Sequence, residues 1–238
     1  MWLAIETATE RASVAVGRSP ADAVEEGLSG ARRHAAGLLS MISAALDRAG
    51  TTLDDLTGLV LSDGPGSFTG LRVGASVAKA LVQARGLPLW TAPSLMVRAS
   101  GVAREGDTVL AVADALRGEV YAAVYRFDAE EIVTLLAPSV YRAETLTGAV
   151  VRPSVLVGEA QPAAVEILAH WAGSRLIGPP EGAPHARQLI GLTARRGGAG
   201  RITAVERWAP EYGRPAEAQA RWEAAHGRAM PDPVGSPR

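Results

Sequence analysis

Short apolar runs alternate with helix-compatible stretches along most of the chain, and turn residues separate them. The clearest pattern lies at residues 59–90, where an apolar run, the turn Asp63-Gly64-Pro65-Gly66, a long proline-free stretch and a second apolar run follow one another. Proline and glycine permit a sharp reversal that suits either a bound anion or a close backbone contact. The pattern predicts a strand at residues 59–61, a helix at 68–85 and a strand at 87–90.

The predicted helix at residues 68–85 is polar on one narrow face only. Its polar residues lie within an arc of roughly 60° at about 100° per residue. They are Arg72, Ser76, Lys79 and Gln83. Gly70, Gly74 and Ala78 form a small-residue ridge that another backbone can approach closely. A helix on one face of a sheet needs a single apolar stripe, so this helix needs a second cover. That cover is another helix or subunit, or else the helix is buried centrally within one domain.

The remaining elements form two similar series. In the first half, strands are predicted at residues 3–6, 12–17 and 23–28, and helices at 35–49 and 94–102. In the second half, strands are predicted at 108–113, 119–127, 132–136 and 154–158, and helices at 162–171 and 183–195. Periodicity fades after residue 201, where a loop, a short helix at 216–226 and a frayed tail at 231–238 are expected.

Two hairpins resemble each other. LAIETATERASVAV, from Leu3, and LAVADALRGEVYAAVY, from Leu110, each contain an apolar strand, an acid (Glu6 or Asp114), an arginine in the turn and a returning strand. This likeness reflects either an internal duplication or a chance match. Mixed strands and helices, twice over, predict two α/β domains with a cleft between them, at residues 1–104 and 105–213, followed by a C-terminal helix and disordered tail at 214–238.

Composition excludes several classes of protein. With 238 residues and 47% hydrophobic residues the chain has ample material for a packed core, and without cysteine it has no disulfide or thiolate nucleophile. Neither a signal peptide nor a membrane-spanning segment is recognisable, so a cytoplasmic location is expected. A net charge of -1 gives no general attraction to nucleic acid. Six arginines are candidates for phosphate contacts or solvated faces: Arg195, Arg196, Arg201, Arg214, Arg221 and Arg228.

Few residues suggest catalysis. A nucleotide-binding P-loop is excluded because Gly70 is followed by Leu71 and Arg72 instead of Lys and Ser/Thr. The four histidines lie singly, without the i, i+4 pair of a metal site, so no metal or cofactor is predicted. Glu6 and Asp114 are candidates to share a cleft, where they would hold a magnesium ion or orient a phosphate; alternatively they accept hydrogen bonds from loop N–H groups.

These motifs resemble a known family. LAIETATERASVAV, DGPGSFTGLRVGASVAKAL, PLWTAPSLMVRA and DALRGEVYAAVY are similar, in this order, to the bacterial TsaB (YeaZ) family of the actin/hexokinase/Hsp70-like superfamily. Beyond Tyr125 only Pro210-Glu211-Tyr212-Gly213-Arg214 resembles the family's C-terminal pattern. The resemblance implies a duplicated actin-like (ribonuclease H-like) fold with a mixed sheet and flanking helices in each half, and dimerisation helices in the first.

The resemblance also implies a role. TsaB-like chains are non-catalytic scaffolds in the formation of N6-threonylcarbamoyladenosine at position 37 of ANN-decoding tRNAs. They bind the catalytic subunit TsaD or a second copy of themselves, with the ATPase TsaE as a third member and tRNA contacted indirectly. In TsaD-like chains two histidines hold the metal, and the aligned positions here are Ser94 and Arg98. Glu6 also departs from the aspartate common in TsaB chains.

We therefore expect a scaffold subunit that docks through its N-terminal helices. The residues expected at this interface are Leu38, Ile42, Phe68, Gly70, Leu71, Val73, Gly74, Val77, Ala78 and Leu81. The alternative is an ATP-dependent phosphotransferase that uses the cleft between Glu6 and Asp114. A peptidase is a third possibility, for which the sequence offers neither a nucleophile nor a metal pair.

Overall fold

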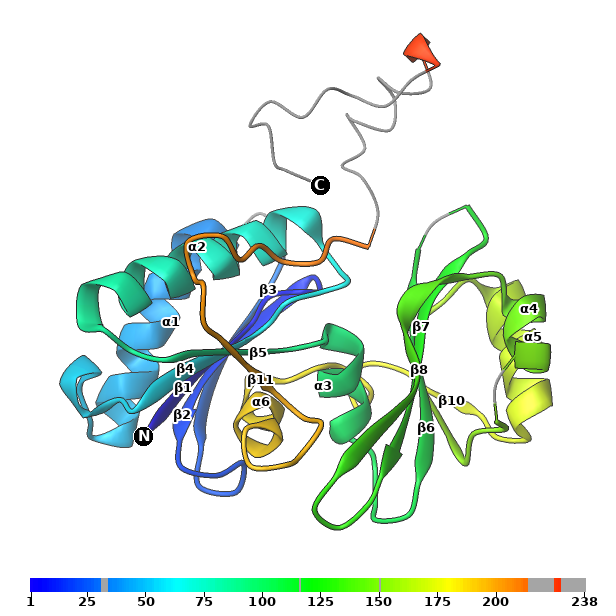
Figure 1. Ribbon diagram of the computed structural model, residues 1–238, viewed down its shortest axis with the longest axis horizontal. Helices are drawn as coiled ribbons and strands as arrows, with labels where there is room; N and C mark the ends of the chain where they lie inside the picture. Colours follow the sequence, from blue (N-terminus) through cyan, green and yellow to red (C-terminus); the bar gives the residue numbers. More distant parts are fainter. Residues whose placement is uncertain (31–33, 116, 150, 214–224, 228–238) are drawn as a thin grey trace.

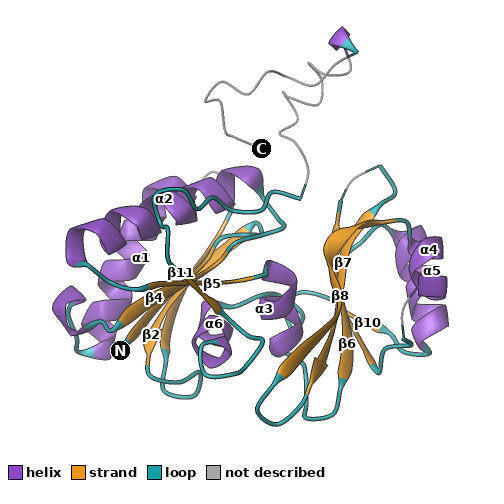
Figure 2. Ribbon diagram, viewed as in Figure 1, coloured by secondary structure: helices purple, strands orange, loops and turns teal. Residues whose placement is uncertain are grey.

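The structure is a computed structural model that describes residues 1–30, 34–115, 117–149, 151–213 and 225–227. Two β-sheets lie side by side, with helices on the outer side of each and two further helices between them (Figures 1 and 2). Most of the predicted helix at residues 216–226, and all of the predicted tail at 231–238, lie outside the described residues.

The first sheet has the strand order β11-β5-β4-β1-β2-β3. Its strands are β1 (Trp2–Glu6), β2 (Arg11–Gly17), β3 (Val24–Ser29), β4 (Gly58–Ser62), β5 (Leu89–Ala92) and β11 (Gly200–Ile202). β1 runs antiparallel to β2 and parallel to β4, so that Ile5 lies opposite both Val14 and Leu61. Two long helices, α1 (His34–Ala49) and α2 (Phe68–Arg85), pack on the outer face of this sheet and bury a common apolar core.

The second sheet repeats this arrangement. Its order is β10-β9-β6-β7-β8, with the same strand directions around its central strand. Its elements are β6 (Thr108–Asp114), β7 (Val120–Phe127), β8 (Ile132–Tyr141), α4 (Ala143–Ala149), β9 (Val155–Gly158), α5 (Pro162–Ala172) and β10 (Leu176–Ile177). Each half therefore runs three strands, helix, strand, helix, strand, helix, and the likeness of the two hairpins extends to the whole unit.

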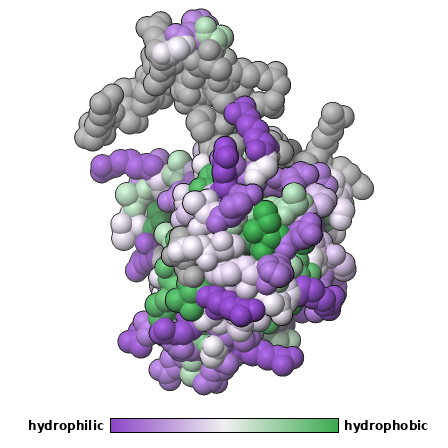
Figure 3. Space-filling view, turned by 90° about the vertical axis from the view of Figure 1, so that its right-hand side faces the viewer, coloured by the Kyte–Doolittle hydropathy of each residue, from purple (hydrophilic) through white to green (hydrophobic). Residues whose placement is uncertain are grey.

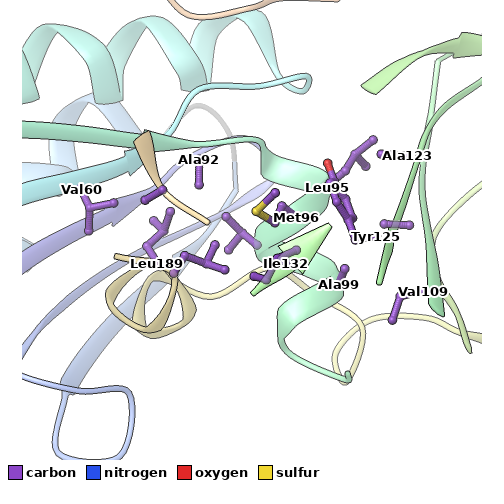
Figure 4. Packing of buried hydrophobic residues seen from close by; sticks show 14 of the residues in the cluster. Val60, Ala92, Leu95, Met96, Ala99, Val109, Ala123, Tyr125, Ile132 and Leu189 are labelled. Carbon is purple, nitrogen blue, oxygen red and sulfur yellow. The ribbon is translucent and has the colours of Figure 1, made fainter. Parts of the chain in front are cut away.

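The last helix of each half crosses to the sheet of the other half. α3 (Ser94–Ser100) packs on β6 and β7, whereas α6 (Ala186–Leu192) packs on β1 and β2. Figure 4 shows the resulting core, in which Leu95, Met96 and Ala99 of α3 lie between the two sheets. After α6 the chain stays with the first sheet, because β11 pairs with β5. The structure thus differs from the expected second domain of residues 105–213, whose last part packs on the first half.

The small-residue ridge of α2 contacts its own chain. A Cβ atom at Gly70 would lie 2.0 Å from the Thr7 carbonyl oxygen, and one at Gly74 would lie 2.4 Å from Thr7 Oγ1. Ala78 is fully buried in the core beneath the helix. The expectation that a second molecule covers this ridge is therefore not met, because the end of β1 covers it.

The second cover of α2 comes from two places in the same chain. α1 packs beside it, and residues 203–213, which we call the C-terminal strap, run along it after β11 (Figure 1). The Lys79 ammonium lies 5.6 Å from the centre of the Trp208 ring, and the rings of Phe68 and Tyr212 lie 4.6 Å apart. An intramolecular cover therefore replaces much of what the sequence assigned to a partner.

Several elements differ from those predicted. β5 begins two residues later than expected, α6 is shorter, and β8 extends past Pro138 to Tyr141. Proline is tolerated there because β8 is an edge strand, which does not use every N–H group for pairing. The sequence patterns missed α4, β10 and β11; the two strands, with 2 and 3 residues, are too short for periodicity to identify.

The close approach at Gly70 predicts a stability effect. Gly70→Ala should lower the free energy of unfolding by about 1–3 kcal/mol, because the new methyl group forces Thr7 away from the helix. Gly148→Ala is the matched control: Gly148 is also helical, but no atom lies within 4 Å of its added Cβ. The control should change stability by at most about 1 kcal/mol, in the stabilising direction. Urea denaturation measures both, and equal behaviour of the two variants would contradict the packing described.

Candidate functional site

The glycine-rich turn, residues 63–67, joins β4 to α2 and packs on the loop after β1. The Ser67 N–H donates to the Ala8 carbonyl at 2.7 Å, and Ser67 Oγ accepts from the Gly70 N–H at 3.2 Å. A Cβ atom at Gly66 would lie 2.3 Å from the Ala8 carbonyl oxygen. Of the two uses expected for this turn, the structure shows the close backbone contact.

Glu6 lies at the end of β1, opposite Ser13 of β2. Its side chain is fully buried, and Oε1 accepts a hydrogen bond from the Ala8 N–H at 2.7 Å. Oε2 has no hydrogen-bond partner among the described residues. Burial raises the pKa of Glu6 to about 7, although the Ala8 N–H, the Ser62 hydroxyl and the positive charge of Arg98 favour its ionised form. The Glu6 carboxyl group is therefore not accessible to a metal ion or a phosphate from solvent.

Asp114 occupies the equivalent position at the end of β6. Its Oδ2 accepts from Gln161 Nε2 at 2.8 Å, so it contacts the start of the second half's own helix α5. The two acids expected to share a cleft therefore each have a different local partner. Within the described part of the chain, no group of three or more His, Cys, Asp or Glu side chains is arranged to hold a metal ion.

Arg98 connects the two halves close to Glu6. It belongs to α3, is only 2% exposed, and donates from Nη2 to Glu159 Oε1 at 2.9 Å and from Nη1 to the Gly182 carbonyl at 3.2 Å. Both acceptors belong to loops of the second half. Sequence reasoning identified Arg98 only as a poor metal ligand; the signal of its structural role was a lone charge in the apolar segment SLMVRAS.

A second acid, Asp63, lies in the turn itself and is partly buried. Burial raises the pKa of Asp63 to about 6; the Thr91 side chain counteracts this shift, and the negative charge of Glu211 adds to it. Tyr125, from β7 of the other half, is fully buried nearby, and its hydroxyl has no hydrogen-bond partner within the described residues. Sequence reasoning did not select either residue, because each is brought there by strands from a different half.

The expected interface residues divide into two groups. Leu38, Ile42, Gly70, Leu71, Gly74 and Ala78 are buried inside the chain, so their side chains are not available to a partner. Phe68, Val73, Val77 and Leu81 remain at least partly exposed on α2. Leu39, which the sequence analysis did not select, is 62% exposed on α1 because it follows the buried Leu38 by 100° around the helix. The outer face of α1 and α2 thus keeps an apolar surface, smaller than predicted.

The corresponding face of the second half is different in character. A hollow of about 770 Å³ lies there between α4 and α5. It is lined by Thr147, Arg152, Glu166, Ile167, His170 and Trp171. In Figure 3, which views this side, hydrophobic side chains form small separate groups among hydrophilic ones. The two halves share a fold, but a hollow lies between α4 and α5, whereas α1 and α2 carry the exposed Leu39 and Phe68.

The duplicated unit, with matching strand order and the last helices exchanged, defines an actin-like (ribonuclease H-like) α/β protein. Comparison with known proteins extends this assignment. The family model described as "TsaD: tRNA N6-adenosine threonylcarbamoyltransferase" matches residues 29–170. The chain belongs to the TsaB (YeaZ) family, and its named relatives indicate a role in tRNA threonylcarbamoyladenosine biosynthesis.

The relatives match different shares of the chain. The tRNA threonylcarbamoyladenosine biosynthesis protein TsaB of Escherichia coli is 37% identical over 156 residues, which cover 61% of this chain and 67% of that protein. TsaB of Haemophilus influenzae is 36% identical, covering 50% of this chain and 51% of its own length. The structure of YeaZ from Pseudomonas aeruginosa has a TM-score of 0.68 at 26% identity and covers 89% of this chain and 98% of its own. None of the helices described is long and apolar enough to cross a membrane.

The buried Glu6 predicts a pH dependence of stability. Its ordinary pKa of 4.5 applies to the unfolded chain, whereas folding raises the pKa to about 7. Between these values the folded state binds more protons, so the free energy of unfolding falls as the pH rises from about 4.5 to 7. Glu6→Gln keeps the shape and removes this loss, which is on the order of 3 kcal/mol.

Denaturation of both proteins at pH 5 and pH 8 checks this. The variant should be similar to the parent at pH 5 and more stable at pH 8. If the free energy of unfolding changes by the same amount in the parent and in the variant between pH 5 and pH 8, Glu6 is not protonated in the folded state.

Proposed function

We propose that this chain is a non-catalytic scaffold subunit of the machinery that forms N6-threonylcarbamoyladenosine at position 37 of ANN-decoding tRNAs. In this proposal it binds and activates a TsaD-like catalytic subunit through the outer face of α1 and α2. A TsaE-like ATPase then joins through the complex, and tRNA contact is indirect. The names of the relatives support the pathway, and the exposed surface of α1 and α2 supports the docking role.

The observation that carries the docking role is the composition of this face. Leu39 and Phe68 are the exposed large apolar residues, and Val73, Val77 and Leu81 are partly exposed along α2. Their exposed neighbours include the short side chains of Ser40, Ser43, Ser76 and Ala80, together with Arg72, whose guanidinium lies over the Phe68 ring. Small side chains let another helix approach closely, and apolar ones gain free energy when they lose contact with water. Such a face suits a helical partner, either a TsaD-like subunit or a second copy of this chain.

The non-catalytic role is supported by what the acids and the metal-equivalent positions do. Ser94 Oγ accepts a hydrogen bond from the Gly64 N–H at 3.1 Å, and Arg98 binds Glu159. Both side chains therefore have structural partners, and the positive charge of Arg98 would repel a metal ion. Glu6 is fully buried, which argues against its use in a phosphotransferase.

Charged substitutions on the docking face should weaken binding. Leu39→Arg and Ser76→Arg each place a long charged side chain in the proposed interface, and each should lower the affinity for a TsaD-like subunit at least about 30-fold. Ala163→Arg is the matched control, since Ala163 is an exposed position on α5, the equivalent helix of the second half. Biolayer interferometry with the catalytic subunit from the same source measures the affinity of each of the three variants. Undiminished binding by both α1 and α2 variants would refute the assignment.

The alternative function is tested by calorimetry. Titration of the isolated chain with ATP and magnesium should give no stoichiometric binding, because Glu6 is inaccessible and Asp114 is bound to Gln161. Tight binding with one site per chain would favour the phosphotransferase.

A further inference from the structure

The C-terminal strap, residues 203–213, makes an extended series of contacts with the first half. It leaves β11 at the edge of the first sheet and runs along α2, drawn in orange in Figure 1. Val205 and Trp208 pack against the core beneath α2. Lys79 lies over the Trp208 ring, and its ammonium donates to the Glu206 carbonyl at 3.4 Å. The strap is therefore a packed part of the fold.

Its last residues bind the glycine-rich turn. The Glu211 N–H donates to the Asp63 carbonyl at 2.7 Å, and a Cβ atom at Gly64 would lie 1.9 Å from the Glu211 carbonyl oxygen. The backbones of strap and turn thus touch, which only a glycine at position 64 allows. Tyr212 then packs on Phe68 at the start of α2, and Pro210 is buried.

The end of the strap also reaches the second half. Gly213 has a φ of +71°, and a Cβ atom there would lie 2.5 Å from the Tyr121 ring and 3.0 Å from Pro65. The Tyr121 hydroxyl is 3.5 Å from the Tyr212 carbonyl oxygen. Tyr121 belongs to β7 and Pro65 to the turn of the first half. The strap therefore lies between the two halves, away from their other connection through α3 and α6 (Figure 1).

The space beside this contact needs to be kept closed. Asp63 is desolvated, and the negative charge of Glu211 repels its own negative charge. The hydroxyl of Tyr125 is buried and has no hydrogen-bond partner in the described part of the chain. Separation of the halves at this point would let water reach these groups, which lowers the free energy of a polar group that lacks a hydrogen bond. Without a contact on this side, the halves could rotate about α3 and α6.

We propose that the C-terminal strap is a conformational clamp: by binding the glycine-rich turn with Glu211 and β7 with Tyr212 and Gly213, it fixes the angle between the two halves. The strap, at the far end of the chain, thereby closes the side of the molecule that the exchanged helices leave open. The clamp acts within the isolated chain and needs no partner.

The absence of cysteine makes a distance measurement direct. Ser43→Cys on α1 and Ala163→Cys on α5 introduce two exposed thiols, one in each half, for spin labels. Double electron–electron resonance on the full chain should give one narrow distance distribution. Gly213→Val combined with Tyr212→Ala should broaden or shift it, because the added side chain clashes with Tyr121 and the Phe68 contact is lost. Glu206→Ala is the control on the same strap, since only the Glu206 carbonyl contacts Lys79.

Amide exchange at Glu211 reports in parallel whether the strap is bound. The double variant should exchange this amide at least tenfold faster than the parent, and circular dichroism should show that both sheets remain folded. Rapid exchange at Glu211 together with an unchanged distance distribution would overturn the proposal, because α3 and α6 alone would then position the halves. Slow exchange of the Glu211 amide in the double variant would also contradict the proposal, because the Tyr212 and Gly213 contacts would then not hold the strap in place.

Discussion

The close contact between α2 and the end of β1 determines how the first half of the molecule is arranged. Gly70 and Gly74 let the helix backbone approach Thr7 so closely that a single methyl group at either position would collide with it. This contact sets the direction in which α2 leaves the glycine-rich turn. It also decides which side of α2 faces outward.

Part of the outward side of α2 is covered by the chain itself, and part of it remains exposed. α1 and the C-terminal strap cover α2 from two directions, with Trp208 over Lys79 and Tyr212 against Phe68. The uncovered part of α2 carries short and apolar side chains beside the exposed Arg72 and Gln83, and Leu39 is exposed on α1. Arg98 is bonded across the two halves, Glu6 accepts a hydrogen bond from the Ala8 N–H, and Asp114 accepts one from Gln161. These features together favour docking over catalysis.

Much of the fold was predictable because it depends on local pattern. The hairpins, α2 with its glycine-rich turn, and the duplication all follow from apolar runs and turn residues close together in sequence. The cover of α2 was not predictable, because the strap lies more than 100 residues away and has no periodicity of its own. The role of Arg98 and the burial of Asp63 were missed for a related reason: Glu159, which binds Arg98, and Tyr125, which lies near Asp63, belong to the other half. Leu38 and Ile42 were assigned to an interface, since an apolar helix face looks the same whether a sheet or a partner covers it.

Hydrogen–deuterium exchange of this chain, alone and mixed with a TsaD-like subunit from the same source, tests the central claim most directly. If α2 is covered by its own chain on the inner side and offers its remaining face to a partner, added protection should be confined to α1 and α2. Peptides from β1, from α4 and from α5 should exchange at unchanged rates. Protection that falls on the α4 and α5 side, or between the two halves around Asp63 and Arg98, would contradict the account.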